Sequence, residues 1–221
     1  VTYCDLCETK KKKAIVTAGP TREFIDPIRY LTNRSSGKQG YEIANSLNKN
    51  GFDTTLISGP TEQNIDQGIK LIKVKTANEM YKETIKSLPA DVCIFSAAVS
   101  DWKVKNYSKN KIKKSDNLSL NLEKNIDILN SISNHNSLRP KLVIGFAAET
   151  NNVENNAQKK LSEKNCDWII ANDVSDDTIG FESDENAITI IYKNNNREKI
   201  AKTSKAIIAD KIVEKIIKQL N

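Results

Sequence analysis

Residues 15–40 read IVTAGPTREFIDPIRYLTNRSSGKQG, and no other stretch of the sequence is as informative about the fold. It opens with an apolar run around Val16 that predicts a buried strand. It closes with a turn of small residues that predicts the start of a helix over residues 38–49. Such a turn presents unpaired backbone N–H groups and the positive end of a helix dipole, so it predicts a site for phosphate or carboxylate. The small residues of the turn are Ser35, Ser36, Gly37 and Gly40.

The connection between that strand and that helix is long and polar. It takes about twenty residues, whereas strand-to-helix connections in simple dinucleotide folds take only a few. Its charged and amide side chains belong to Arg22, Glu23, Asp26, Arg29 and Asn33. A polar loop of this length inside a compact domain is usually functional, so we expect it to form part of a site.

Apolar runs alternate with helical patterns along the rest of the chain. The expected strands cover residues 13–17, 53–58, 69–75, 92–97, 142–146 and 168–172, and the expected helices cover 38–49, 78–87, 126–134, 152–164 and 204–220. Continuous apolar strands between helices predict a parallel sheet covered on both faces, which is a doubly wound, Rossmann-like α/β fold. Residues 188–192 and 198–201 predict a late hairpin at one edge. We expect one domain over residues 13–221, preceded by a tail or linker remnant at 1–12.

Small residues with single carboxylates or amides follow four of the predicted strands. Ligands of a doubly wound sheet bind beyond the carboxyl ends of its strands, so these segments predict one site. Small residues let a ligand approach the backbone, and the carboxylates can hold hydroxyl groups or a magnesium ion. The segments are AGPT at 18–21, AAVSD at 97–101, AAET at 147–150 and NDV at 172–174.

The composition narrows the class of protein. The chain has 221 residues, a net charge of +6 and a pI near 9.0, but its aromatic residues make up only 6%. Nucleic-acid modules show clustered base-stacking aromatics, so we expect no nucleic-acid partner, and the basic surface suits a small polyanionic substrate instead. No run approaches the roughly 18 apolar residues that span a bilayer, and no signal-peptide pattern occurs. We expect a soluble cytoplasmic protein without a membrane partner.

Cysteine and histidine usage argues against several chemistries. Cys4 and Cys7 form a single Cys-x-x-Cys pair without the second pair that a structural zinc site needs. Cys93 and Cys166 fall in predicted strands, so we expect them to be small buried apolar residues. His135 is the one histidine, in a polar segment that predicts an exposed turn. Ser-His-Asp or Cys-His catalysis and multi-histidine metal sites are therefore disfavoured.

Lysine-rich segments lie near the predicted site. Residues 109–114 read KNKIKK and follow Trp102 and Tyr107. Such a run is either a solvated face or a mobile lid over a triphosphate. Lys160 and Lys164 lie one helical turn apart and are expected to project from one face, where they could meet a phosphate or solvent.

Five ordered motifs resemble phosphopantothenoylcysteine synthetase, the second half of the bacterial bifunctional coenzyme A biosynthesis flavoprotein. They are residues 18–40, SAAVSDW at 96–102, KIKK at 111–114, GFAAETNNVE at 145–154, and ANDVS at 171–175 followed by GFESDENA at 180–187. The resemblance implies a two-step ligation. The carboxylate of 4′-phosphopantothenate attacks the α-phosphate of a nucleoside triphosphate and releases pyrophosphate, and the amine of L-cysteine then displaces the nucleoside monophosphate. Bacterial members use CTP and eukaryotic members favour ATP, with Mg²⁺ accompanying the triphosphate; the magnesium ligands stay open.

The same resemblance implies roles for individual residues. Asn33 matches a catalytic asparagine whose amide donates to the acyl-phosphate oxygen, and Lys111 matches the lysine of the lid. Arg29 matches an arginine that reaches the substrate of the neighbouring subunit, which implies a homodimer with shared sites. Asp127 falls in a segment that contacts the base, although relatives often have proline where this chain has Ile126. The implied nucleotide-binding residues are Gly19, Ser35, Gly37, Gly40, Asp127, Phe146, Lys160, Lys164 and Asn172, and those for phosphopantothenate are Ala97, Ala98 and Asp101.

One departure from the family pattern is large. Bifunctional relatives carry an amino-terminal flavin-dependent decarboxylase, and nothing in this sequence would bind FMN in that manner. We therefore expect either a stand-alone synthetase, which could associate with such a decarboxylase, or a domain excised from a fusion. The start at Val1 without methionine favours excision.

Two alternative functions stay open at this point. Tyr107 and Lys111 form the Tyr-x-x-x-Lys spacing of short-chain NAD(P)-dependent reductases, but only Gly19 supplies a glycine directly after the first strand. A basic nucleic-acid-binding module would bind in a salt-dependent manner and would not require Asn33. A Walker-type NTPase is excluded because the sequence has no Gly-x-x-x-x-Gly-Lys-Ser/Thr motif.

Overall fold

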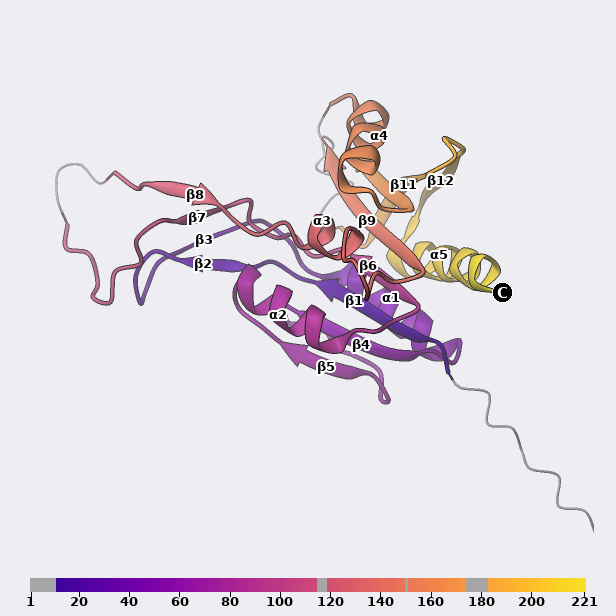
Figure 1. Cartoon of the computed structure of the whole chain (residues 1–221), viewed down its shortest axis with the longest axis horizontal. Coiled ribbons are helices and arrows are strands. Elements are labelled where there is room, and N and C mark those ends of the chain that lie inside the picture. Colours follow the sequence, from indigo (N-terminus) through magenta and orange to yellow (C-terminus); the bar gives the residue numbers. More distant parts are fainter. Residues whose placement is uncertain (1–10, 115–118, 150, 174–182) are drawn as a thin grey trace, which may run out of the picture.

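The computed structural model describes residues 11–114, 119–149, 151–173 and 183–221. Its centre is an eight-stranded sheet (Figure 1). The strands are β1 (Lys13–Ala18), β4 (Asp53–Ser58), β5 (Lys70–Lys73), β6 (Val92–Phe95), β9 (Leu142–Glu149), β10 (Trp168–Asp173), β11 (Glu185–Tyr192) and β12 (Arg197–Ser204). Their order across the sheet is β12-β11-β10-β9-β6-β1-β4-β5. All pairs from β5 to β10 are parallel.

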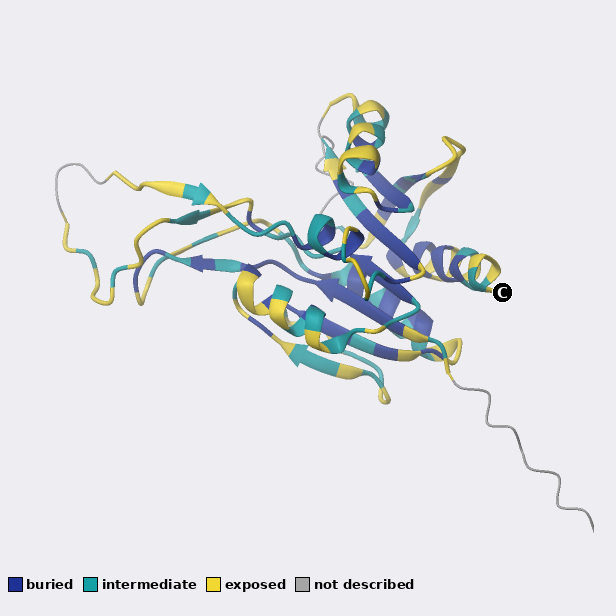
Figure 2. Ribbon diagram, viewed as in Figure 1, coloured by how far each residue is buried: buried dark blue, intermediate teal, exposed yellow. Residues whose placement is uncertain are grey.

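Helices cover both faces of this sheet. They are α1 (Lys38–Lys49), α2 (Ala77–Ser87), α3 (Ile128–Ser133), α4 (Val153–Lys164) and α5 (Lys205–Leu220). Apolar side chains of α1 and α5 pack in one core cluster, and those of α2, α3 and α4 pack in a second cluster on the opposite face. The central strands are buried on both sides (Figure 2). This arrangement confirms the predicted doubly wound, Rossmann-like α/β fold.

The predicted late hairpin is confirmed at one edge of the sheet. β11 pairs antiparallel with β10, and β12 pairs antiparallel with β11. Both strands are longer than the sequence indicated. The additional residues are nearly all polar, for example Glu185 and Asn186 in β11 and Lys202 and Thr203 in β12, so the apolar run at 188–192 marked only the most buried part of β11.

Two further hairpins were not predicted. β2 (Arg22–Phe24) pairs with β3 (Tyr30–Thr32), and β7 (Trp102–Val104) pairs with β8 (Leu122–Lys124). They project side by side from the sheet as an arm, defined here as residues 22–32, 102–114 and 119–124 (Figure 1). The prediction of a loop between the first strand and the first helix was therefore wrong for β2 and β3. Each of these strands has three residues and mostly exposed or half-buried side chains, which gives no periodic signal.

Several predicted boundaries differ from the structure by a few residues. α3 begins at Ile128 rather than at 126 because the carboxylate of Asp127 caps it, accepting a hydrogen bond from the amide of Asn130 at 2.9 Å. β9 continues to Glu149, beyond the expected end at 146, because it stays paired with β10 from Ile144 to Glu149. β6 ends at Phe95 rather than at 97.

The two described cysteines behave as interior residues, as predicted. Both are buried, and Cys93 lies in β6. Cys166 was expected inside a strand but lies just before β10. Burial raises the pKa of both thiols, that of Cys166 to about 12. Cys4 and Cys7 lie outside the described residues.

His135 occupies the turn after α3, but it is half-buried rather than exposed. Its Nδ1 accepts a hydrogen bond from the amide of Leu138 at 3.1 Å, so the ring closes the turn. Within the described ranges, no cluster of three or more histidine, cysteine or carboxylate side chains could hold a metal ion. No helix in the same ranges is long and apolar enough to cross a membrane.

Candidate functional site

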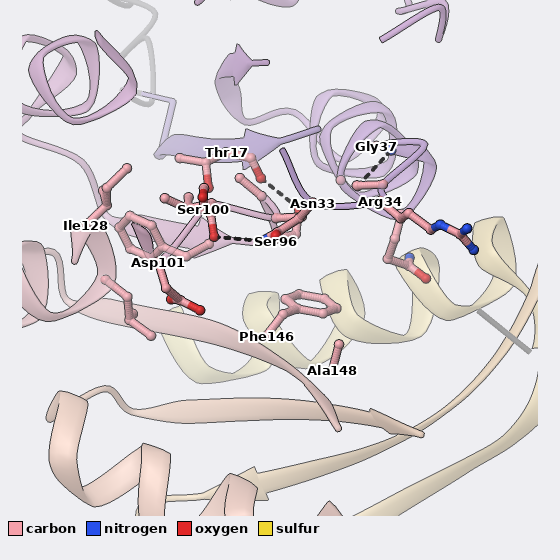
Figure 3. A pocket seen from close by; sticks show the side chains of 18 of the residues that line it. Thr17, Asn33, Arg34, Gly37, Ser96, Ser100, Asp101, Ile128, Phe146 and Ala148 are labelled. Carbon is pink, nitrogen blue, oxygen red and sulfur yellow. Dashed lines mark hydrogen bonds between the residues drawn. The ribbon is translucent and has the colours of Figure 1, made fainter. Parts of the chain in front are cut away.

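A cavity of about 860 Å³ opens beyond the carboxyl ends of the central strands (Figure 3). Its walls come from β6, β9 and β10, from the start of α1, and from α3 and α4. Most residues singled out from the sequence line it: Asn33, Ser35, Gly37, Gly40, Ala97, Ala98, Asp101, Asp127, Phe146, Lys160, Lys164 and Asn172. The fold therefore gathers residues as far apart in the sequence as Asn33 and Asn172.

Glycines bring the start of α1 close to β1. A Cβ atom on Gly40 would lie 2.6 Å from the Cβ of Ala18 and 2.4 Å from the Oγ of Ser96, so only glycine fits without displacement. Gly37 is the N-cap residue of α1 and has a φ of 75°, a conformation that favours glycine. As a glycine it has no side chain that could accept a hydrogen bond from the helix amides. The Oγ of Ser35 accepts a hydrogen bond from the amide of Gly37 at 3.2 Å, and the Oγ of Ser36 accepts one from the amide of Lys38 at 3.4 Å. Gln39 and Gly40 line the cavity, so the positive end of the helix still faces it and favours an anion. Gly19 lies directly behind Gly37 and is not a lining residue.

Hydrogen bonds tie the turns after β1 and β6 together at the floor of the cavity. The Oγ of Ser96 donates to the carbonyl oxygen of Thr17 at 2.7 Å, and the Nδ2 of Asn33 donates to the carbonyl oxygen of Val99 at 3.0 Å. Among the described residues, Val99 is the acceptor for this amide group, so its second N–H can donate to a ligand. The carboxylate of Asp101 points into the open part of the cavity (Figure 3).

The α4 side of the cavity carries two cations. The Nζ of Lys160 donates to the carbonyl oxygen of Phe146 at 3.1 Å. Lys164 forms an ion pair with Asp127, the residue that caps α3. Both lysines project from one face of α4 into the cavity, so this wall combines positive charge with an aromatic ring.

Four lining residues on the opposite side were missed in the sequence. They are Lys38, Gln39, Asn186 and Lys205. The position of Lys38 inside the small-residue turn was an available signal, but nothing local marks Lys205, which reaches the cavity only because α5 packs against α1. Among the described residues, two buried polar atoms of the cavity wall have no hydrogen-bond partner: the Oε1 of Gln39 and the Nδ2 of Asn125. Buried unsatisfied polar atoms in a wall indicate a polar ligand.

Arg29 and Lys111 lie on the arm and do not line the cavity of their own chain. The Nε of Arg29 donates to the buried carboxylate of Asp26 at 2.9 Å, and another guanidinium nitrogen donates to the carbonyl oxygen of Ile112 at 2.8 Å. The guanidinium holds the pKa of Asp26 well below its usual range, assisted by three backbone amides and opposed by desolvation. This cluster fixes the segment that carries Lys111 against the tip of the β2–β3 hairpin.

Comparison with protein-family models identifies the family of the chain. The model described as the DNA/pantothenate metabolism flavoprotein C-terminal domain matches residues 9–220. The chain belongs to this family. The resemblance seen in the ordered motifs is thereby confirmed, although residues 174–182 of the last motifs lie outside the described part of the structure.

Similar proteins agree with this family. The coenzyme A biosynthesis bifunctional protein CoaBC of Vibrio parahaemolyticus is 41% identical over 209 residues, which cover 93% of this chain and 52% of that protein. The chain thus spans about half the length of the curated relatives it matches. A crystal structure of the C-terminal domain of a CoaBC protein superposes with a TM-score of 0.79 at 36% identity, covering 95% of each chain.

A more distant structure shares the fold alone. A Cab2 mutant in complex with phosphopantothenate-cysteine superposes with a TM-score of 0.70 at 17% identity, covering 95% of this chain and 86% of that one. The family match supports neither the reductase nor the nucleic-acid module as an alternative.

Proposed function

We propose that this chain is a phosphopantothenate–cysteine ligase that works through an acyl-nucleotidylate, with CTP as the expected nucleotide and ATP as the alternative. One observation carries the proposal. A single cavity gathers the start of α1, the Asn33 amide and lysines from both faces of the sheet. Both steps of such a ligation develop negative charge, so they need positioned donors and cations more than a histidine base.

The first step would take place between the two lysine-bearing walls. The carboxylate oxygen of phosphopantothenate forms a bond to the α-phosphorus, and the bond from that phosphorus to the bridging oxygen breaks, so pyrophosphate leaves. We place the nucleoside end beside Phe146, Asp127 and Lys164, because an aromatic ring, a carboxylate and an ammonium group meet there. Phosphopantothenate would lie along Ala97, Ala98 and Asp101, where small side chains allow close approach to the backbone.

The second step would use Asn33. The amine of L-cysteine forms a bond to the acyl carbon, the carbon–oxygen bond to the phosphate breaks, and the nucleoside monophosphate leaves while the amine proton passes to phosphate or solvent. The bond from Asn33 to Val99 fixes the plane of the amide. Its second N–H can then donate to the oxygen on which charge develops.

The site fits a magnesium ion that enters with the triphosphate. Mg²⁺ in phosphoryl-transfer sites is held by one or two carboxylates together with substrate phosphates and water. Asp101 presents one exposed carboxylate to the cavity, whereas Asp127 is already paired with Lys164. The residues described therefore fit an ion held mainly by the nucleotide, with Asp101 as the protein ligand. When bound, it would neutralise phosphate charge.

The arm supports a homodimer with shared sites. Most of the exposed large apolar side chains in the described ranges lie on it: Ile28, Tyr30, Trp102, Tyr107, Leu120 and Leu122. An exposed apolar surface of this kind favours a protein partner. A second copy of the chain is the partner that would also bring Arg29 and Lys111 to a cavity. We further propose a flavin-dependent decarboxylase as the functional partner, because the curated relatives are named as bifunctional proteins.

Pyrophosphate release tests this function. The protein is incubated with 4′-phosphopantothenate and Mg²⁺, with CTP or ATP, in the presence and absence of L-cysteine. We expect release that depends on phosphopantothenate and is faster with CTP, with ligated product only when cysteine is present. Absence of release with both nucleotides, from folded protein, would refute the ligase. A nicotinamide absorbance change would instead favour the reductase.

A further inference from the structure

One buried carboxylate organises the turn between β2 and β3. The side chain of Asp26 is fully buried, and its Oδ1 accepts hydrogen bonds from the amides of Ile28 at 2.9 Å and Arg29 at 2.8 Å. Its Oδ2 accepts from the Nε of Arg29 at 2.9 Å, from the Nη2 of Arg29 at 2.5 Å and from the amide of Ile112 at 3.2 Å. These hydrogen bonds use the whole acceptor capacity of a carboxylate, so Asp26 itself is closed to a ligand.

The guanidinium group of Arg29 is held along one edge. Its Nη2 also donates to the carbonyl oxygen of Ile112 at 2.8 Å, so the N–H of Nε and both N–H groups of Nη2 are used. The two N–H groups of Nη1 have no acceptor among the residues that the structure describes, and the side chain is 41% exposed. In a planar guanidinium, Nη1 lies on the side opposite the Nε–Nη2 edge. The open side of this cation can therefore donate to an oxyanion.

The position of this cation distinguishes it from the lysines of the cavity. Arg29 does not line the cavity of its own chain, and the arm that carries it projects from the sheet (Figure 1). A second contact holds the same turn, since the amide of Ser108 donates to the carbonyl oxygen of Ile25 at 3.0 Å. The direction of the guanidinium is thus set within the arm. An anion that meets Nη1 has to come from outside the cavity of the same chain.

Asp26 has two opposite effects on anion binding by Arg29. An unrestrained arginine side chain loses rotamer freedom when it binds an anion, and this loss weakens binding. Asp26 fixes Nε and Nη2 before a ligand arrives, so most of that loss no longer falls on the binding step. The negative charge of Asp26 acts in the other direction, because it offsets the cation and repels an incoming anion. Removing the carboxylate therefore weakens binding if positioning dominates and strengthens it if charge dominates.

We propose that Asp26 is a positioning residue for the ligation, which orients the guanidinium of Arg29 so that Nη1 donates to an anionic group of phosphopantothenate in the cavity of a second copy of the chain. This inference rests on the proposed ligase function and on the proposed homodimer with shared sites. Asp26 contacts no substrate in this arrangement. It acts through Arg29, whose two contacts with Asp26 and one with Ile112 leave a single direction for the remaining donors.

Steady-state kinetics of pyrophosphate release test the inference. Asp26→Asn keeps the size of the side chain but replaces one acceptor oxygen by an NH2 donor, so the hydrogen bonds of the carboxylate cannot all form. Arg29→Lys keeps the positive charge but lacks the planar fork that Asp26 holds. Ile216→Val in the core cluster of α5 is the control, because it lowers stability without changing the arm.

The KM for 4′-phosphopantothenate and the KM for CTP (or for ATP, if ATP supports release) are measured for the full chain and each variant. Circular dichroism and thermal melting first show that each protein is folded at the assay temperature. We expect the KM for phosphopantothenate to rise about 3- to 10-fold in Asp26→Asn, the effect of losing the prior ordering of one long side chain. The KM for the nucleotide, and both constants of Ile216→Val, should stay within about twofold, as for changes remote from a site.

Arg29→Lys should raise the KM for phosphopantothenate at least as much as Asp26→Asn. Adding Asp26→Asn to Arg29→Lys should then bring no further rise, because no guanidinium is left to orient. A purely structural role of Asp26 would not give this dependence on Arg29.

Three results would overturn the inference. A lower KM for phosphopantothenate in Asp26→Asn would show that the carboxylate only offsets the charge of Arg29, and an unchanged KM would show that it does not act on the substrate. A further rise in the double variant would show that Asp26 acts independently of Arg29. If Asp26→Asn does not fold, Arg29→Lys decides: a raised KM supports the inference and an unchanged one overturns it. Failure of the unaltered protein to release pyrophosphate would refute the ligase itself and is therefore distinguishable.

Discussion

At the scale of single residues, the proposed role of Asn33 depends on a backbone contact that orients its side chain. Its Nδ2 donates to the carbonyl oxygen of Val99 at 3.0 Å, although the residue itself is exposed. In Asn33→Asp, a carboxylate would face that carbonyl oxygen and could not donate to a developing oxyanion. Because the position is exposed, we expect the fold to persist. Cysteine-dependent product formation should fall by about 100-fold or more, the effect of removing one oxyanion donor.

Product formation and phosphopantothenate-dependent pyrophosphate release are measured separately for this variant. Release should persist, since the first step does not use the Asn33 donor. Asn136→Asp introduces the same charge in an exposed turn after α3 and serves as the control. Full ligation by Asn33→Asp would show that the asparagine has no role in catalysis.

At the scale of elements, the contact between the two hairpins of the arm depends on one carboxylate. Asp26 accepts hydrogen bonds from the amides of Ile28 at 2.9 Å and Ile112 at 3.2 Å, and it also pairs with Arg29. Its pKa lies well below the ordinary range, chiefly because of the Arg29 guanidinium. Ionised Asp26 therefore stabilises the folded protein above about pH 4, and this contribution is lost as the pH falls from there towards the lowered pKa.

The variant Asp26→Asn should consequently unfold at a lower urea concentration than the unaltered protein near neutral pH. The difference should shrink as the pH falls below about 4, the ordinary pKa of aspartate, because Asp26 of the unfolded chain then binds a proton while Asp26 of the folded protein stays ionised, so the unaltered protein loses the stability that its carboxylate provides. Urea unfolding curves at several pH values measure this. Asp53→Asn, at the exposed start of β4, is the control. A difference that does not change with pH would contradict the argument.

The same scale shows what the sequence could and could not predict. Long apolar runs such as 142–146 identified the parallel strands because burial on both faces leaves no polar positions. The small residues Gly37 and Gly40 likewise predicted a close approach of α1 to the first strand, which the structure has, whereas the anion site at α1 stays a prediction. β7 gave no signal, because Trp102 is exposed and three residues show no periodicity. Lys205 was missed because its place in the cavity depends on how α5 packs against α1, which no local pattern records.

At the scale of the whole molecule, residues of the proposed site lie in two separate places, the cavity and the arm. Asn33 lines the cavity, whereas Arg29 lies on the arm beside Asp26 and Ile112. If the arm of one subunit completes the cavity of the other, a site needs Asn33 from one chain and Arg29 from its partner. Variants in these two residues should therefore complement each other in mixed dimers, which a site built within one chain could not show.

Complementation is tested by unfolding Asn33→Asp and Arg29→Ala together in equal amounts and refolding the mixture. Half of the dimers are then mixed, and each mixed dimer has one site with both defects and one with neither. We expect activity to return to about a quarter of that of the unaltered protein, since about a quarter of all sites are intact. The activity measured is cysteine-dependent product formation; each variant refolded alone is the control and should form almost no product. Leu122→Asp on the arm should give monomers in sedimentation velocity and abolish the recovery, because Leu122 is an exposed apolar side chain of the arm. Refolded mixtures no more active than the separate variants would show that Arg29 acts within its own chain or not at all.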